Sequence, residues 1–419
     1  MARVATATGG RPATTGVIPG RWALSVGNPG TPTAPGFEWV RLSDLARLES
    51  GHTPSRNKPE YWDGEIPWVG IRDATANHGR TIHSTKQAIS ELGLANSSAR
   101  LLPAGTVCLS RTASVGYVVT MGVPMATSQD FVNWICGPEL SPRLLHYILM
   151  CEQESVRRFA HGTTHQTVYY PEAKAFHVCI PGRPEQDAIA ALLGALDEKI
   201  VVNERIATAA DELRMIQMEA AAREDPALVP LSSLASFVNG RNFTKDASGS
   251  GRMVIRIAEV GSGPGASTVY NDVETSEQHL ARPGDVLFSW SGTLKVARWC
   301  RPEALINQHI FKVVPNGGVP AWMMFDLIAG ELPAFRAIAA DKATTMGHIQ
   351  RKHLDKSVAV PKRELWGSLD RSLGVLWNRA LVADREALAL ADLRDTLLPK
   401  LISGELRVKD AERLVSGAV

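Results

Sequence analysis

The stretch LGALDEKIVVNERI, residues 193–206, lies near the middle of the 419-residue chain and decides its fold. Leu193, Leu196 and Ile200 recur at spacings of three and four, which predicts a helix with an apolar stripe. Asn203 falls on the same stripe. One polar residue within an apolar stripe is typical of a helix that pairs with another helix in a fixed register.

The chain contains the same series of segments twice, in the same order. LSDLARLESG (from Leu42) matches LSSLASFVNG (from Leu231), and PAGTVCLSRTASV (from Pro103) matches RPGDVLFSWSGTL (from Arg282). TSQDFV at 127–132 matches INQHIF at 306–311, Pro181 matches Pro361, and ELR at 212–214 matches DLR at 392–394. Each match is separated by roughly 180 residues, so the protein is two copies of one unit.

Each copy begins with a mixed α and β part and ends in one long helix. Short apolar runs between Gly and Pro predict strands, and longer amphipathic runs predict helices. The expected strands are 106–110, 130–136, 285–289 and 309–314, the shorter helices 142–159 and 320–339, and the long helices about 185–224 and 364–403. The predicted fold class is therefore α+β, with two mixed α/β domains separated by two long helices and an internal pseudo-two-fold repeat.

Both long helices carry an apolar stripe that has to be covered. We predict that they cover each other as an antiparallel coiled coil, with Asn203 penalising slipped registers. The alternative is that each helix packs only on its own domain. The predicted pairing residues are Leu193, Leu196, Ile200 and Asn203 in the first helix, and Leu373, Leu376, Ala380 and Ala383 in the second.

These features predict six segments. They are a flexible N-terminal extension at 1–36, a first domain at 37–184, a spacer helix at 185–225, a second domain at 226–363, a second spacer helix at 364–405 and a C-terminal tail at 406–419. The extension is rich in Gly, Pro, Thr and Ala, which leaves little to bury.

Composition narrows the function classes only slightly. A net charge of +2 permits a nucleic-acid partner without indicating one. The five cysteines form no CxxC pair, which favours a reduced, cytoplasmic chain, and no apolar run reaches the ~18 residues of a membrane helix. His161 and His165 have the spacing of helical metal ligands, but the glycine and threonines between them favour a loop, so we expect no metal site.

No motif predicts catalysis by this chain. A GxxxxGK[ST] loop, a GxGxxG turn and a GxSxG elbow are absent, as is an Asn-Pro-Pro-Tyr type tetrad. Asp197, Glu198 and Lys199 resemble a nuclease cluster, but consecutive helical residues point in different directions.

Polar and basic residues recur in corresponding loops of both copies, as expected for contacts to DNA phosphates and base edges. The candidates are Arg56, Lys58, Arg72, Arg111, Ser114, Gln129, Thr163, Thr164 and His165 in the first copy, and Arg256, Trp290, Lys295, Gln308, Thr344, Thr345, His348 and Arg351 in the second. Gln129 and Gln308 recur in both copies, so a shared structural hydrogen bond is an equal alternative for them. Positions where the copies differ, such as Arg111 and Trp290, are better candidates for reading two different half-sites.

Several of these segments together resemble the specificity subunit of a type I restriction-modification system. They are PGFEWVRLSDLA (35–46), SGHTPSRNKPEYWDGEIPWVGIRD (50–73), the loops at 162 and 344, LGALDEKIVVNERI, and LRDTLLPKLISGELRV (393–408). His52 departs from the pattern, where a glycine is common, and residues 1–36 have no place in it.

The resemblance implies a non-catalytic DNA-recognition subunit. Each domain would be a target-recognition domain that reads half of a split site in double-stranded DNA, and the paired helices would fix the gap. Two methyltransferase subunits that bind S-adenosylmethionine would dock on the helices, and motor-nuclease subunits that use ATP and magnesium would join them, with no cofactor on this chain. The alternatives are a scaffold that only dimerises enzymes and a modification enzyme with an unrecognised motif.

Overall fold

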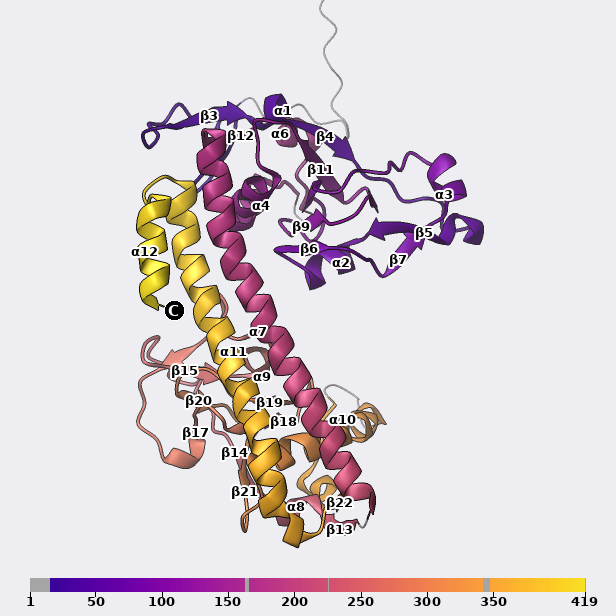
Figure 1. Cartoon of the computed structure of the whole chain (residues 1–419), viewed down its shortest axis with the longest axis vertical. Helices are drawn as coiled ribbons and strands as arrows, with labels where there is room; N and C mark the ends of the chain where they lie inside the picture. The colour runs from indigo at the N-terminus through magenta and orange to yellow at the C-terminus, as the bar shows by residue number, and fades with distance from the viewer. Residues whose placement is uncertain (1–15, 163–165, 225, 342–346, 419) are drawn as a thin grey trace, which may run out of the picture. The chain divides into compact units, whose positions relative to one another are not determined.

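The structure, a computed structural model, describes residues 16–162, 166–224, 226–341 and 347–418. Its chain divides into two compact units. Unit 1 takes the residues up to Asp197 together with those from Asp392 onward, and unit 2 is Glu198–Ala391. Helices α7 (Arg183–Glu224) and α11 (Trp366–Ile402) each contribute to both units (Figure 1). The predicted mixed α and β fold with two long helices is confirmed.

The described residues of unit 1 form three sheets. Their strand orders are β1(Ile18–Pro19)-β2(Leu24–Val26)-β12(Phe176–Pro181)-β3(Phe37–Arg41), β4(Ala46–Ser50)-β11(Phe131–Cys136)-β8(Val107–Ser110)-β9(Val118–Met121)-β6(Arg80–Ile82), and β10(Ala126–Thr127)-β5(Trp62–Val69)-β7(Gln87–Ile89). The helices are α1(Leu42–Leu45), η1(Pro59–Tyr61), α2(Ile71–Ala76), α3(Glu91–Ala95), α4(Pro142–Cys151), α5(Gln153–Phe159), α6(Tyr170–Lys174) and α12(Val408–Ala418).

In unit 2, the part of the chain that the structure describes also forms three sheets. Their strand orders are β13(Ala227–Pro230)-β22(Ser357–Val360), β14(Ala235–Asn239)-β21(Ile310–Pro315)-β18(Val286–Ser289)-β19(Lys295–Arg298), and β16(Tyr270–Asn271)-β15(Arg252–Ile255)-β20(Ala304–Ile306)-β17(Leu280–Ala281). The helices are α8(Leu231–Leu234), α9(Ile257–Ser262), η2(Glu277–His279), α10(Ala321–Asp341), η3(Arg351–Asp355) and η4(Arg363–Leu365).

The internal repeat of the sequence is a repeat of topology. The order β4-β11-β8-β9 of unit 1 recurs in unit 2 as β14-β21-β18-β19. The parallel pair β5 and β10 recurs as β15 and β20, and the antiparallel pair β3 and β12 recurs as β13 and β22. Two sequence copies therefore fold by one plan.

A glycine at the end of β4, and its counterpart after β14, shows why the repeated phrase ends in this residue. A Cβ on Gly51 would lie 2.0 Å from the carbonyl oxygen of Ser128, and one on Gly240 would lie 2.2 Å from that of Asn307. Only a residue without a side chain allows the backbone of the neighbouring segment to approach so closely.

The segment before residue 37, expected to be an extension with little to bury, contributes strands to unit 1. Leu24 and Val26 are buried, and β2 pairs with β12. The reason is Glu152, whose fully buried carboxylate accepts hydrogen bonds from the backbone amides of residues 21–24 at 2.6–3.2 Å. This expectation was wrong for the described residues 16–36, because composition does not reveal a partner that lies more than a hundred residues away.

Glu152 also explains why the predicted helix 142–159 is two helices. The residue lies between α4 and α5 with φ −94° and ψ 17°, outside the helical range of ψ. Its carboxylate is thereby directed at the amides of the N-terminal segment rather than along the helix.

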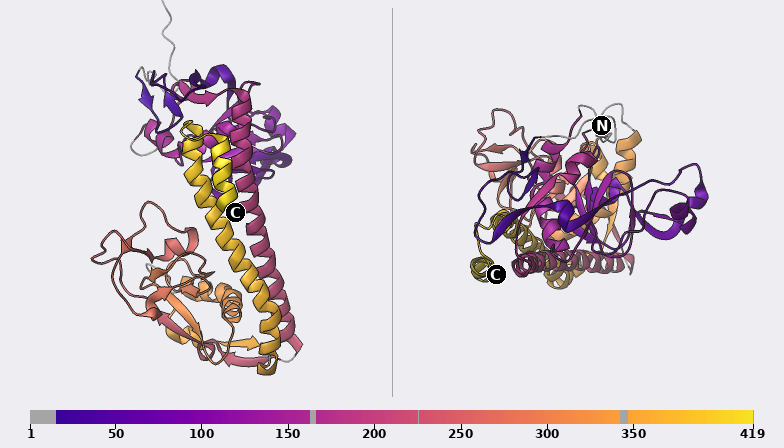
Figure 2. Two further views of the ribbon diagram at one scale, coloured as in Figure 1. Left: turned by 60° about the vertical axis from the view of Figure 1, so that its left-hand side comes forward. Right: turned by 90° about the horizontal axis from the view of Figure 1, so that it is seen from above.

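The two long helices pair within unit 2. Ala207 and Ala210 of α7 form one buried cluster with Ala380 and Ala383 of α11, and the Arg214 guanidinium carbon lies 5.1 Å from the ring centre of Trp377. Residue numbers fall along α11 as they rise along α7, so this pairing is antiparallel (Figures 1 and 2).

The other predicted pairing residues are buried as well. Leu373 is fully buried, Asn203 is 9% exposed, and Leu376 is half-buried against the alanine cluster. The core of unit 2 joins Met218 of α7 and Leu373 of α11 to the strands and to α10. In unit 2, each long helix thus covers the other long helix and also packs on the sheet domain. Pairing of the helices and packing of each helix on a domain therefore occur together.

In unit 1, the end of α11 meets the start of α7. Arg394 Nη1 donates a hydrogen bond to Asp197 Oδ1 at 2.7 Å, and Arg407, just beyond α11, lies 3.7 Å from the Glu185 carboxylate. Leu193 and Leu196 are buried. The helix direction is again antiparallel.

Candidate nucleic-acid interface

A pair of loops is built in the same way in both units. In unit 1 the turn after β8 bonds to the segment that follows α5: Ala113 N donates to Gln166 O at 3.0 Å and Val168 N donates to Arg111 O at 2.8 Å. In unit 2, Gly292 N donates to Gly347 O at 2.9 Å and Ile349 N to Trp290 O at 3.0 Å. In each unit, the structure therefore joins two loops whose candidate residues were identified separately in the sequence.

A serine hydroxyl shapes each turn. Ser110 Oγ donates to Ser114 O at 2.5 Å, and Ser289 Oγ donates to Thr293 O at 2.7 Å. The turn residues Ala113 and Gly292 have φ of 60° and 64°, in the left-handed region. The backbone of this turn and its hydrogen bonds are the same in both units, and we call this arrangement the loop frame. The two units therefore differ in the side chains that the loop frame carries.

Arg111 and Trp290 occupy the equivalent position on the two frames. Arg111 Nε donates to Gln129 O at 3.0 Å, and its guanidinium carbon lies 5.1 Å from the Tyr170 ring centre. Trp290 stacks on Phe311, with ring centres 5.8 Å apart. A guanidinium suits guanine edges and phosphates, whereas an indole offers an apolar stacking surface. The two units therefore present a cationic side chain and an aromatic side chain at the same position of the repeat.

Arg56 is held in a fixed orientation in unit 1. Its guanidinium carbon lies 3.6 Å from the ring centre of Trp62 and 5.1 Å from that of Trp68, and Nη2 donates to Gln87 Oε1 at 3.1 Å. Arg56 and Gln87 are both exposed. A stacked guanidinium has lost much of its rotamer freedom before any ligand arrives.

Lys58 lies near the same loop, with its ammonium 5.3 Å from the Tyr61 ring centre. Arg72 is exposed on α2. Arg56 and Lys58 lie between β4 and β5, and Arg72 lies on α2, which follows β5.

The two repeated glutamines have different partners. Gln129 Oε1 accepts a hydrogen bond from Thr53 Oγ1, whereas Gln308 Nε2 lies 3.4 Å from His309 Nε2. Among the described residues, these two side-chain contacts differ between the units, so they do not form one shared hydrogen bond.

Arg256 is engaged inside unit 2. Its guanidinium pairs with Glu259 at 2.5 Å and donates to Ser267 O at 2.7 Å. Burial opposes ionisation of Glu259, but hydrogen bonds from Arg256 and Thr268 hold the pKa of this carboxyl below its ordinary value. A phosphate contact by Arg256 would have to compete with this ion pair.

The remaining described candidates of unit 2 are Arg351, His348 and Lys295. The Arg351 guanidinium carbon lies 5.5 Å from the ring centre of Phe311, and Arg351 Nη2 donates to Phe237 O at 3.0 Å. His348 forms an isolated bridge with Ser291, and Lys295 begins β19. Thr163, Thr164, His165, Thr344 and Thr345 lie outside the described residues.

Sequence reasoning missed three residues of this interface: Gln87, Tyr170 and Phe311. Phe311 could have been found, because it lies three residues after Gln308 in a repeated segment. Gln87 and Tyr170 carry no local signal, since they reach Arg56 and Arg111 only through the fold.

The cysteines offer no reactive thiolate. Burial raises the pKa of Cys136 and of Cys151 to about 12 and that of Cys179 to about 11, and it also raises the pKa of Cys108 and Cys300. All five are free thiols that stay protonated near neutral pH.

Residues 35–210 match the family described as the type I restriction modification DNA specificity domain. The specificity subunit of the type I restriction enzyme MjaIX of Methanocaldococcus jannaschii is 22% identical, over 88% of this chain and 93% of that protein. The EcoR124I/EcoR124II specificity subunit of Escherichia coli is 27% identical, over 38% of this chain and 41% of that protein. The crystal structure of a type I restriction-modification S subunit from M. genitalium has the same fold, with a TM-score of 0.53 and 15% identity, over 87% of this chain and 96% of that one.

Among the helices of the described residues, none is both long and apolar enough to span a membrane.

Proposed function

Because this chain belongs to the family of type I restriction-modification specificity subunits, we propose that its two recognition domains each read one half of a split DNA site. The chain is the DNA-recognition component of such a complex and not its catalytic component. The recognition domains are those expected at 37–184 and 226–363, and the helices between them set the gap between the two half-sites.

The observation that carries this proposal is the shared loop frame with unlike side chains. A frame repeated in backbone hydrogen bonds presents Arg111 in one unit and Trp290 in the other. A protein that held two identical ligands would keep the same side chains at both places. Two different half-sites require different donors, acceptors and apolar groups at equivalent positions.

The partners implied by the family are two methyltransferase subunits and the motor-nuclease subunits. Large apolar side chains exposed on the long helices of unit 2 suit such docking: Val202, Ile216, Val375 and Val382 are 46–64% exposed. S-adenosylmethionine would be bound by the methyltransferase subunits, and ATP with magnesium by the motor-nuclease subunits.

A domain exchange tests the proposal. Residues 37–181 are replaced by the corresponding segment of a relative, the chain is combined with its methyltransferase partner, and methylated bases are mapped by sequencing. We expect one half of the methylated site to change and the other half to persist. A change in both halves, or methylation without sequence preference, would contradict the modular reading and favour a scaffold.

Arg56 provides a test at the level of one side chain. We expect Arg56→Ala to relax discrimination at one base pair of one half-site by about 1–3 kcal/mol, because the stacked guanidinium loses its contact with a base edge. Arg56→Lys keeps the charge but not the planar fork, so discrimination is lost while affinity is largely kept. Binding to a panel of single-base variants at fixed salt measures both quantities.

Lys58→Ala is the matched control for Arg56, because it removes a cation from the same loop. We expect it to weaken binding to all sequences alike and to reduce the salt slope by roughly one. Equal weakening of all sequences by Arg56→Ala would instead assign Arg56 to a phosphate.

A further inference from the structure

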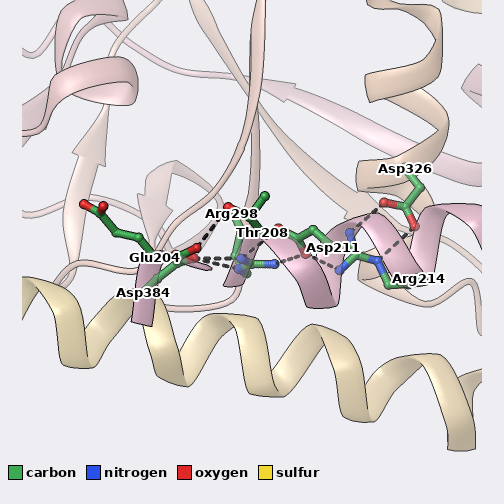
Figure 3. A network of polar contacts seen from close by, with 7 residues as sticks. All are labelled: Glu204, Thr208, Asp211, Arg214, Arg298, Asp326 and Asp384. Atoms are coloured by element: carbon green, nitrogen blue, oxygen red, sulfur yellow. Dashed lines mark hydrogen bonds and ion pairs between the residues drawn. The ribbon is translucent and has the colours of Figure 1, made fainter. Parts of the chain in front are cut away.

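A buried ion-pair cluster joins a recognition domain to the long helices in unit 2 (Figure 3). Arg214 of α7 is fully buried, and its Nε and Nη2 donate to the two carboxylate oxygens of Asp326 of α10 at 2.9 and 2.7 Å. Arg298 of β19 bridges Asp211 of α7 and Asp384 of α11 at 2.9 and 2.7 Å. The recognition domain thus supplies a carboxylate to an arginine of the helix.

Unit 1 has a corresponding cluster, in which the carboxylate and the aromatic residue come from different elements than in unit 2. Arg394 of α11 donates to Asp197 of α7 at 2.7 Å. The other oxygen of Asp197 accepts the hydroxyl hydrogen of Tyr147 of α4 at 2.5 Å. Here the carboxylate stands on a long helix and the recognition domain supplies an aromatic residue.

The residues of the two clusters occupy corresponding positions in the two sequence copies. Arg214 and Arg394 end the matched ELR and DLR segments. Tyr147 and Asp326 are each the sixth residue of their helix, α4 and α10.

On the long helices, the same separation that relates Arg214 to Arg394 places Asp197 opposite Trp377 in the alignment. The Trp377 ring centre lies 5.1 Å from the Arg214 guanidinium carbon. Carboxylate and aromatic ring have therefore exchanged places between the two units, around an arginine that both keep.

We propose that this exchange determines which recognition domain fits which stretch of the helix pair, and so fixes the order of the two half-sites. The part about half-sites rests on the proposed function, whereas the fit of domain to helix does not. Leaving a buried guanidinium without its carboxylate is strongly destabilising. A domain with tyrosine at this position would leave Arg214 with Asp211 as its only remaining carboxylate partner among the described residues. A domain with aspartate would bring a third carboxylate to Arg394, which already pairs with Asp197 and Asp395.

The fit is tested by converting the cluster of unit 2 into that of unit 1. We expect Asp326→Tyr to lower the melting temperature by about 5–10 °C, because Arg214 loses its main acceptor. Adding Trp377→Asp restores a carboxylate and raises the melting temperature again. Trp377→Asn in the same background is the control: it leaves a similar cavity but no charge, and it does not restore stability.

The proposal fails if Trp377→Asp and Trp377→Asn behave alike in the Asp326→Tyr background. Should Asp326→Tyr not fold, the same comparison is made with Asp326→Asn, which keeps the size of the side chain. There too, only Trp377→Asp is expected to raise the melting temperature.

The order of half-sites is tested with a chain in which residues 16–181, which include the backbone amides that Glu152 accepts from, also replace residues 226–361. With its methyltransferase partner and Trp377→Asp, we expect methylation of DNA that carries the first half-site twice. Without Trp377→Asp, this activity falls at least tenfold. Equal activity of the two chains overturns the proposed role in domain order. Failure of the half-site readout alone, with the stability cycle intact, counts against the proposed function and not against the fit.

Discussion

A chain shortened by four residues in each long helix is expected to lose methylation of the native site and to regain it on DNA with closer half-sites. Residues 199–202 of α7 and 388–391 of α11 are suitable, since the antiparallel pairing in unit 2 sets these segments opposite each other. At ~1.5 Å per residue the helices shorten by about 6 Å, a little under two base pairs at ~3.4 Å each. Mapping methylated sites on a library with randomised gaps measures the shift.

Deleting the four residues from α7 alone is the control for this experiment. It shifts one apolar stripe against the other and buries residues out of register, so the chain is expected to lose stability and activity on every gap length. An unchanged gap preference in the doubly shortened chain would show that the length of the helices does not set the distance between the half-sites.

The second large effect is expected for Glu152→Ala, which should lower the free energy of unfolding of unit 1 by about 3–5 kcal/mol. The substitution removes the acceptor of the backbone amides of residues 21–24, which then lie partly or fully buried without that partner. Urea denaturation measures the loss. Hydrogen exchange at these amides shows whether β2 separates from β12 before the rest unfolds.

Glu154→Ala is the matched control for Glu152→Ala. Glu154 is two residues further on, is 79% exposed, and pairs with the Arg21 side chain at 4.0 Å. Surface pairs of this kind contribute little, so we expect a change within about 0.5 kcal/mol. A similar loss for both substitutions would mean that the buried hydrogen bonds of Glu152 do not hold the N-terminal segment.

Much of the fold could be predicted because its signals are local and repeated. The strand runs at 106–110 and 309–314 appear as β8 and β21. The long helices begin and end within two residues of the ranges 185–224 and 364–403, whereas the spacer segment given as 364–405 extends three residues beyond α11. Apolar spacing of three and four is a property of neighbouring residues, so it survives whatever the rest of the chain does.

The candidate interface was predictable only in part. Repeated segments located the loops around Arg111 and Trp290, and the structure joins each loop to its second segment by matching hydrogen bonds. The engagement of Arg256 with Glu259 was not visible in the sequence, although only three residues separate them. Their pairing depends on a buried helix end, which local pattern does not reveal.

The sequence alone determined that the chain is a tandem repeat with two long helices, since a repeat and an apolar period are properties of order along the chain. The tertiary structure decided which distant groups meet. In the folded chain, the Glu152 carboxylate accepts hydrogen bonds from N-terminal amides, and Gln87 accepts one from Arg56. Each of two equivalent arginines meets a carboxylate, which comes from the sheet domain for Arg214 and from the other long helix for Arg394. Buried charges are stable only where all their partners converge, and such convergence is a property of three-dimensional packing rather than of spacing.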